Sequence, residues 1–378
     1  MYWSRRRFIG LAARTAGAGL LPGCMAACKD EESYSVALLG DTHFDSPDPK
    51  FYHRHYTHST TKARYELHLK EHVRNSEMWA ERMPRLIAAS GANVRADTAF
   101  ALQMGDLIQG DCGNPATHRR MLADAFAMIK GAYGGKLPLV TVVGNHDIRG
   151  DIPEDGALAA FDEWQPPLMT KELGVPVAET TFAFRKGPDV FIVVDFNAPR
   201  PKLAKVKRLL SENADVRHTF IVSHGPVVPS GASRWFLLGG KDRDGERREL
   251  LHLLAARNAI ALSGHTHRLE LYDCVLPEGR VTQFVANSVW TKPELAVPHV
   301  LDEGAAAYGS RVKAAKEGGR SGSKAGLRSL VAEYRPFMRD YLFANADGHY
   351  RLEVSASRVA VVFFGGDSSR PARTFVLR

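Results

Sequence analysis

Ser263-Gly264-His265-Thr266-His267 is the stretch of sequence that decides the fold, and it follows an apolar run over residues 258–262 that is typical of a buried strand. Two histidines at positions i and i+2 beyond a strand end can present both imidazole rings from one loop. Neutral imidazole is the commonest side-chain ligand of zinc, iron and manganese ions. Paired surface histidines are more often solvated than metal-bound, so the interpretation depends on what the other strand ends contribute.

Four other short apolar runs end in polar side chains in the same way. Helical patterns separate the first of these runs, which predicts an α/β sheet with crossover connections. In such sheets functional groups gather beyond the carboxyl ends of the strands. The runs over 36–40, 98–104, 137–143 and 220–223 lead respectively into Asp41-Thr42-His43, Gly105-Asp106, Gly144-Asn145-His146-Asp147 and His224-Gly225-Pro226.

Taken in order, the motifs D-x-H, G-D, G-N-H-D, H-G and G-H-x-H resemble the calcineurin-like metallophosphoesterase superfamily over about residues 35–270. Each motif is weak alone, but five in this order, each closing an expected strand, make a specific signal. The resemblance implies an α/β fold of the α+β type, a four-layered αββα sandwich with mixed sheets and two metal ions at one edge. It also implies hydrolysis of phosphomonoesters or phosphodiesters by attack of a metal-bound hydroxide.

The resemblance further implies which side chains hold the metals. A bridging carboxylate can bind two cations at once, and its charge offsets their mutual repulsion. A neutral amide oxygen limits the negative charge of the site. Two metals held in this way can clamp a phosphate oxygen and lower the pKa of bound water. By this resemblance one ion is held by Asp41, His43 and His267, the other by Asn145, His224 and His265, and Asp106 bridges both.

Two further residues of the motifs have no metal assigned. By resemblance His146 approaches the leaving group or a non-bridging oxygen, as general acid or charge stabiliser. Asp147 is expected to orient the ring of His146. Purple acid phosphatases carry a tyrosine ligand three residues after the Gly-Asp carboxylate, where this chain has Gln109. We therefore expect no iron–tyrosinate colour, and two divalent ions such as Mn, Zn or Fe as cofactors.

A long helix is expected over residues 62–89, with Pro84 kinking or interrupting it. His68 and His72 lie one turn apart on this helix, and without a third ligand we interpret the pair as a surface coincidence. Residues 150–190 are rich in proline and are expected to be irregular.

We expect one metallophosphoesterase domain over residues 34–378, with insertions at 44–61 and 301–335. The first insertion is dense in His and Tyr, and a solvated loop over the cleft mouth that helps select substrate is favoured over a metal-binding tract. The second predicts a mobile basic insertion or a helix pair with a flexible join. Cys112 and Cys274 could pair in an oxidising compartment, but separate buried thiols are the favoured interpretation.

The first residues predict export. A basic segment and a short apolar run over residues 1–23 predict a signal peptide rather than a membrane span. Ser4-Arg5-Arg6-Arg7-Phe8-Ile9 resembles a twin-arginine signal of an exported bacterial protein, with a general secretory signal as the alternative. Leu21-Pro22-Gly23-Cys24 resembles a lipobox, which would make Cys24 a lipid anchor, with cleavage nearer Cys28 as the alternative. We expect a periplasmic or cell-envelope location.

The formal net charge of +8 depends partly on this leader, which holds four arginines and no acid. Without them 46 of the 50 basic residues remain against 42 acidic ones, a net charge of +4. This balance suits an anionic phosphate ester, and with no nucleic-acid motif it does not argue for nucleic-acid binding. Two alternatives stay open: a catalytically silent phosphate-binding, metal-binding or scaffolding protein on the same fold, and a metallohydrolase of non-phosphate substrates.

Overall fold

Strands and helices alternate along the first part of the chain, and antiparallel strands dominate its last part. The computed structural model describes residues 32–45, 62–150, 156–197, 203–230, 236–239, 243–314 and 324–378, which belong to one compact unit. In chain order the elements are β1 (Tyr34–Leu39), α1 (Lys62–Ala92), β2 (Thr98–Gln103), α2 (Pro115–Ala132), β3 (Leu139–Thr141), α3 (Ala157–Leu173), β4 (Phe182–Lys186), β5 (Asp189–Val194), α4 (Leu203–Glu212), β6 (Thr219–Ser223), α5 (Asp244–Ala256), β7 (Ile260–Ser263), β8 (Leu269–Leu276), β9 (Gly279–Val285), β10 (His299–Glu303), α6 (Lys324–Tyr334), β11 (Met338–Asn345), β12 (Gly348–Val354), β13 (Val359–Gly365) and β14 (Arg373–Val376).

The strands form two mixed sheets. The six-stranded sheet has the order β14-β13-β12-β1-β2-β3, with β1, β2 and β3 parallel and β12 to β14 antiparallel. The eight-stranded sheet has the order β10-β11-β8-β9-β7-β6-β5-β4, with β5, β6, β7 and β9 parallel. Because parallel strands end at the same edge of a sheet, each sheet gathers several of the predicted motifs at one edge.

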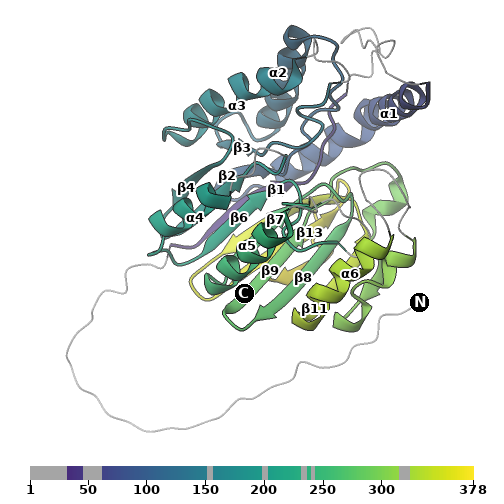
Figure 1. Ribbon diagram of the computed structural model, residues 1–378. Coiled ribbons are helices and arrows are strands. Elements are labelled where there is room, and N and C mark those ends of the chain that lie inside the picture. Colours follow the sequence, from purple (N-terminus) through teal and green to yellow (C-terminus); the bar gives the residue numbers. More distant parts are fainter. Residues whose placement is uncertain are drawn as a thin grey trace, which may run out of the picture. The chain divides into compact units, whose positions relative to one another are not determined.

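Side chains of β5 alternate between two apolar cores, which shows how the layers stack. Phe191 and Val193 belong to the core shared with the six-stranded sheet, whereas Val190, Ile192 and Val194 belong to the core under α4, α5 and α6. Burial on both faces explains why this strand is a continuous apolar run rather than an alternating one. Figure 1 shows α1 to α3 on one side of the paired sheets and α4 to α6 on the other. The predicted four-layered αββα sandwich is confirmed.

At two places, prolines in the sequence led us to expect a break or irregular structure where the protein forms a helix. Helix α1 continues through Pro84, so the proline does not interrupt it, and the alternative of a kink stays a prediction. Met83 and Leu86 beside it are fully buried, and their packing offsets the hydrogen bond that the proline cannot make. Residues 157–173, expected to be irregular, form α3 with Pro166 and Pro167 inside it. Tertiary packing therefore overrides the local signal at both sites.

The two predicted insertions are described in part. Residues 46–61 lie outside the described residues, and so do residues 315–323. Within the second insertion, Tyr308 and Leu327 are buried in the core beside the eight-stranded sheet, so its described parts pack into the body of the protein and are not a mobile insertion. Such burial depends on long-range contacts that composition does not encode.

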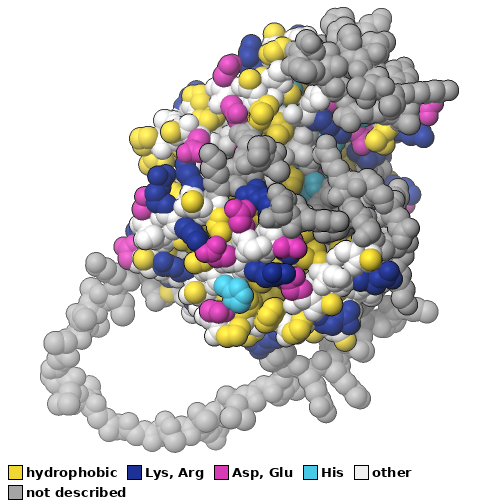
Figure 2. All heavy atoms as spheres, in the orientation of Figure 1, with side chains coloured by type: hydrophobic (Ala, Val, Ile, Leu, Met, Phe, Trp, Pro, Cys, Tyr) yellow, Lys and Arg dark blue, Asp and Glu magenta, His cyan; other side chains and the backbone are white. Residues whose placement is uncertain are grey.

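Further observations concern the cysteines, the leader, the helices and the surface. Cys112 and Cys274 are buried and form no disulfide with each other, as predicted. Residues 1–31, which include the predicted leader over residues 1–23, lie outside the described residues. None of the described helices has the length and apolar character that crossing a bilayer requires. On the face seen in Figure 2, basic and acidic side chains are interspersed among the described residues.

Candidate metal centre

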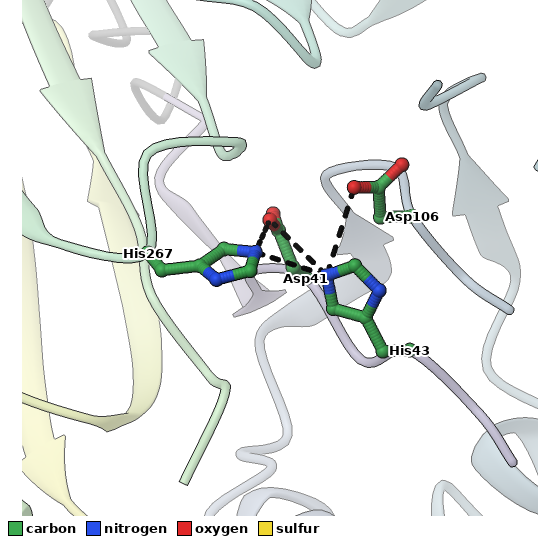
Figure 3. Close-up of side chains that lie close together, drawn as sticks. All are labelled: Asp41, His43, Asp106 and His267. Atoms are coloured by element: carbon green, nitrogen blue, oxygen red, sulfur yellow. Dashed lines mark hydrogen bonds and ion pairs between the residues drawn. The ribbon is translucent and has the colours of Figure 1, made fainter. Parts of the chain in front are cut away.

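The candidate metal centre lies where the carboxyl ends of the two sheets meet. Each of the five predicted motifs follows a strand, as expected from the sequence. Figure 3 shows that side chains from separate segments of the chain point toward one another at this edge. The motifs after β1, β2 and β3 supply Asp41, His43, Asp106 and Asn145, and those after β6 and β7 supply His224, His265 and His267.

Asp41, His43, Asp106 and His267 form the first group of candidate ligands, with ligand atoms all within 4.8 Å of one another. His43 Nε2 lies 2.9 Å from His267 Nε2, which in turn lies 3.0 Å from Asp41 Oδ2. His43 Nε2 is also 3.6 Å from Asp106 Oδ2. Two atoms bound to one ion at about 2.1 Å can be at most about 4.2 Å apart. These separations therefore fit a shared divalent ion.

Asp106, His224 and His265 form the second group, again within 4.8 Å. His224 Nε2 lies 3.1 Å from Asp106 Oδ2 and 3.0 Å from His265 Nδ1. The other nitrogen of His224, Nδ1, lies 2.8 Å from the carbonyl oxygen of Met104. Because a carbonyl oxygen only accepts, Nδ1 donates to it, which leaves Nε2, facing Asp106 and His265, as the ring nitrogen that could bind a metal ion. Asp106 is the one residue that both groups share.

Asn145 supplies a further test of whether metal ions fit. Its Oδ1 atom is buried and has no hydrogen-bond partner among the described residues. A buried acceptor without a partner needs an explanation, and a cation bound at this point is one. The neighbouring main-chain N–H of His146 donates to Asp106 Oδ1 at 2.8 Å, so this turn lies directly against the shared carboxylate. The residues present therefore fit a pair of divalent ions.

Glycines allow the loops to approach the carboxylates this closely. A Cβ atom on Gly144 would lie 2.2 Å from Asp106 Oδ1, and one on Gly264 would lie 2.2 Å from Asp41 Oδ1. Side chains at either position would displace the carboxylates. The glycines of G-N-H-D and G-H-x-H are thus required by close contact rather than by the turn alone.

Four candidate ligands have left-handed backbone conformations. The φ angles are 43° for His43, 51° for Asp106, 72° for His265 and 51° for His267. Positive φ is uncommon for residues other than glycine and costs of order 1–3 kcal/mol each. Strain of this kind persists only where surrounding contacts impose it, and here it turns side chains from three loops toward one point.

Burial and neighbouring charge shape the electrostatics of the centre. Burial lowers the pKa of His43 well below its usual value, and the positive groups around it, His267 first, add to the shift. Burial also acts to lower the pKa of His224, but the charges of Asp106 and Asp41 outweigh it and raise the pKa to about 9. Two fully buried carboxylates thus attract positive charge, as expected of a cation site.

His146 lies beside the two groups without belonging to either. Its ring is 4.5 Å from the ring of His43, edge to face. Its Nδ1 lies 3.0 Å from the carbonyl oxygen of Gln109, and its Nε2 lies 3.2 Å from Arg149 Nη1. Nδ1 must donate and Nε2 must accept, because a carbonyl cannot donate and a guanidinium cannot accept. In this state His146 would have to gain a proton at Nε2 before it could act as a general acid.

The prediction that Asp147 orients the ring of His146 is wrong. Its two carboxylate oxygens accept the main-chain N–H groups of Gly144, at 2.8 Å, and Ile108, at 3.1 Å. Burial, and then the charge of Asp106, raise the pKa of Asp147. Asp147 therefore joins the loop after β3 to the loop after β2. Its carboxylate accepts from main-chain N–H groups of those loops and not from the ring of His146.

The motifs do not reveal a polar network that reaches this centre from α1. Arg149 donates from Nε to Asp111 Oδ2 at 2.6 Å and from Nη2 to Glu71 Oε2 at 2.9 Å. Gln109, at the position of the purple acid phosphatase tyrosine, donates to Glu71 and accepts from Asn75. The side chain of Gln109 is thus engaged with α1. Only the spacing of Arg149 from the G-N-H-D motif could have suggested its place.

His68 and His72 also belong to this region, so their interpretation as surface residues is wrong. Both are buried. His72 Nδ1 lies 3.0 Å from Asp45 Oδ2, and His68 Nδ1 lies 3.7 Å from Asp111 Oδ2. One face of α1 packs against the loops after β1 and β2, which the charged surroundings of this pair in the sequence did not indicate.

Comparison with known proteins agrees with this geometry. A purple acid phosphatase from yellow lupin (Lupinus luteus) seeds superposes with a TM-score of 0.51 at 11% identity, covering 92% of this chain and 54% of that one. PhoD superposes with a TM-score of 0.50 at 11% identity, covering 91% and 68%. At such low identity these likenesses show the fold alone, and this chain spans only about half of the purple acid phosphatase.

A search of curated proteins gives no match to the sequence. The model of the calcineurin-like phosphoesterase family, however, matches residues 34–269, which span all five strand-end motifs. That match covers more than half of the chain. The chain therefore belongs to the calcineurin-like phosphoesterase family.

Proposed function

We propose that this protein is a dinuclear-metal hydrolase of phosphoric esters, acting on phosphomonoesters or phosphodiesters. The observation that carries the proposal is that Asp106 is common to both groups of candidate ligands. Ions that share one carboxylate lie close enough to clamp a single phosphate group. One ion would be held by Asp41, His43 and His267, the other by Asn145, His224 and His265, and both by Asp106.

When bound, such a pair supplies the positive charge that stabilises phosphate oxygens and acidifies water. In the net reaction the oxygen of water bonds to phosphorus, the ester P–O bond breaks, and the leaving oxygen takes up a proton. The chain's contribution is to hold the ligands rigidly. Main-chain N–H groups of His265 and His146 fix the carboxylates of Asp41 and Asp106 before substrate arrives.

His146 fits a role toward the substrate rather than toward metal. It is held at both ring nitrogens, and its ring packs against His43. Once its Nε2 carries a proton, a ring fixed in this way can stabilise charge on a phosphate oxygen or on the leaving group with little reorganisation.

The test uses 4-nitrophenyl phosphate and bis(4-nitrophenyl) phosphate with protein loaded with Mn²⁺ or Zn²⁺. Release of nitrophenol should depend on metal, disappear after chelation and return when metal is restored. Two metal equivalents without hydrolysis of either ester class would contradict the proposal and favour the catalytically silent alternative. Hydrolysis that survives complete metal removal would also contradict it.

We also propose that the protein is exported and anchored in the cell envelope through Cys24. The proposal is supported by the basic segment, the short apolar run and the lipobox-like sequence before Cys24. Lipid labelling in a bacterial host should mark the wild-type chain and not the Cys24→Ala variant. Equal labelling of both would place the anchor elsewhere, and recovery of the unprocessed chain in the cytoplasm would contradict export.

A further inference from the structure

Arg149 is a guanidinium held in place beside the candidate metal centre. Its Nε and Nη2 atoms donate to the carboxylates of Asp111 and Glu71. Those contacts use one side of the planar group and leave the Nη1 side facing His146 Nε2 at 3.2 Å. The side chain is 15% exposed, so part of it is open to contact by a ligand. Two anchors on one guanidinium mean that little flexibility is lost when its remaining N–H groups bind.

A second guanidinium lies in the same region. Arg74 on α1 donates from Nε to Asn75 Oδ1 at 3.0 Å. Burial lowers the pKa of Arg74, the charge of Glu71 acts to raise it, and the charge of Arg149 lowers it further. Two part-buried arginines in one region favour an anion that binds between or beside them.

We propose that Arg149 binds a non-bridging oxygen of the substrate and makes the centre selective for phosphomonoester dianions over phosphodiester monoanions. The proposal rests on the proposed function and adds to it the substrate class. A phosphodiester carries a carbon substituent where a phosphomonoester offers a charged oxygen. Both esters offer charged non-bridging oxygens, but the monoester dianion spreads two charges over three of them, so a guanidinium placed at the third oxygen gains a charge-assisted hydrogen bond that the alkoxy oxygen of a diester cannot match.

The experiment measures binding instead of turnover. Inorganic phosphate and dimethyl phosphate are titrated calorimetrically into metal-loaded and metal-free protein at pH 8, where phosphate is mostly a dianion because its second pKa is about 6. Arg149→Met removes the charge, and Arg149→Lys keeps the charge but loses the planar fork. Arg120→Met on α2, where the side chain is 57% exposed and pairs with Asp124, is the matched control.

Arg149→Met should weaken phosphate binding about 10- to 100-fold, the value of a hydrogen bond to a charged group. Dimethyl phosphate should change less than about 3-fold, because it lacks the second charged oxygen. Arg149→Lys should lie between, Arg120→Met should match wild type, and two metal equivalents should remain in every variant.

Equal weakening of both ligands, or no weakening of phosphate, would overturn the proposal. So would loss of metal from Arg149→Lys, because Arg149 would then be a brace for the loops. Should Arg149→Met fail to fold, the phosphate-specific weakening in Arg149→Lys decides the matter. If neither ester class is hydrolysed, the proposed function fails, whereas these affinities still settle whether Arg149 recognises a dianion.

Discussion

Two regions of this molecule meet at His146, and they differ in how they are built. The strand-end centre uses side chains on loops after β1, β2, β3, β6 and β7, with left-handed backbone and glycines at close contacts. The region beside it, formed by α1 and the segment around Arg149, uses long side chains that meet through salt bridges and hydrogen bonds. The first is strained and is built from residues close together in each loop, whereas the second joins long side chains of α1 to the loops after β2 and β3.

This difference predicts that mutations in the two regions have different effects on activity and on stability. Strain at four candidate ligands is a cost that only a bound cation or a rigid scaffold can offset. The α1 region contributes charge and shape around substrate, and its contacts resemble ordinary buried pairs. We therefore expect changes at the strand ends to remove metal and activity, and changes in the α1 region to affect stability or substrate choice.

The largest effect is expected from Asp106→Asn. An amide cannot neutralise two cations, so bound metal should fall from two equivalents to one or none, and kcat/KM should fall by at least about 10³-fold. Metal analysis and the 4-nitrophenyl phosphate assay measure both. Asp124→Asn, on the exposed face of α2, is the control. If Asp106→Asn retained two equivalents of metal, the proposed difference between the two regions would be contradicted.

His146→Ala should keep both metals and lose turnover. The main-chain N–H of residue 146 still holds Asp106, so the centre stays assembled, while the loss of a preorganised polar group should lower kcat about 10²- to 10³-fold. His252→Ala, in an exposed pair with Glu278, is the control. Unchanged turnover in His146→Ala would rule out its role toward substrate.

His72→Ala should destabilise the protein without changing its metal content or its catalytic activity. It removes a buried hydrogen bond to Asp45, which should lower the free energy of unfolding by roughly 2 kcal/mol. Metal content should not change, and kcat/KM should stay within about 3-fold of wild type. Denaturant unfolding beside His252→Ala checks this, and loss of metal would show that α1 supports the centre directly.

Asp347→Asn tests a buried carboxylate that lies outside both regions and does not belong to the proposed metal centre. Burial raises its pKa from 3.8 to about 8, so its stabilising contribution is full below pH 3.8 and is lost as pH rises through about 8. Asparagine mimics the protonated form. The variant should exceed wild type by about 1–2 kcal/mol in unfolding free energy at pH 9 and match it near pH 4. A constant difference across this range would contradict the shift.

Sequence patterns predicted which strand-end side chains come together, because each candidate ligand stands directly after a short apolar strand and the spacing is local. The same patterns missed α3, since Pro166 and Pro167 are breakers in isolation. They also placed His68 and His72 on the surface. Where α1 docks is decided by contacts between segments far apart in the chain, such as His72 with Asp45 and Glu71 with Arg149.

The error at Asp147 has the same cause. A carboxylate after His146 suggests a partner for the ring, but its oxygens found main-chain donors on two loops that only the folded chain brings together. Gln109 similarly marks a departure from a metal-binding tyrosine in sequence, and only the structure reveals that its side chain links the loop after β2 to Glu71 and Asn75 of α1. Neighbouring positions in the sequence predict candidate functional residues, but the fold determines which groups those residues contact.

Anomalous diffraction from crystals of the metal-loaded protein tests the central claim most directly. The account predicts two peaks about 3.5–4 Å apart, with oxygens of Asp106 bound to both ions. A single peak, or two peaks of which Asp106 reaches only one, would contradict it.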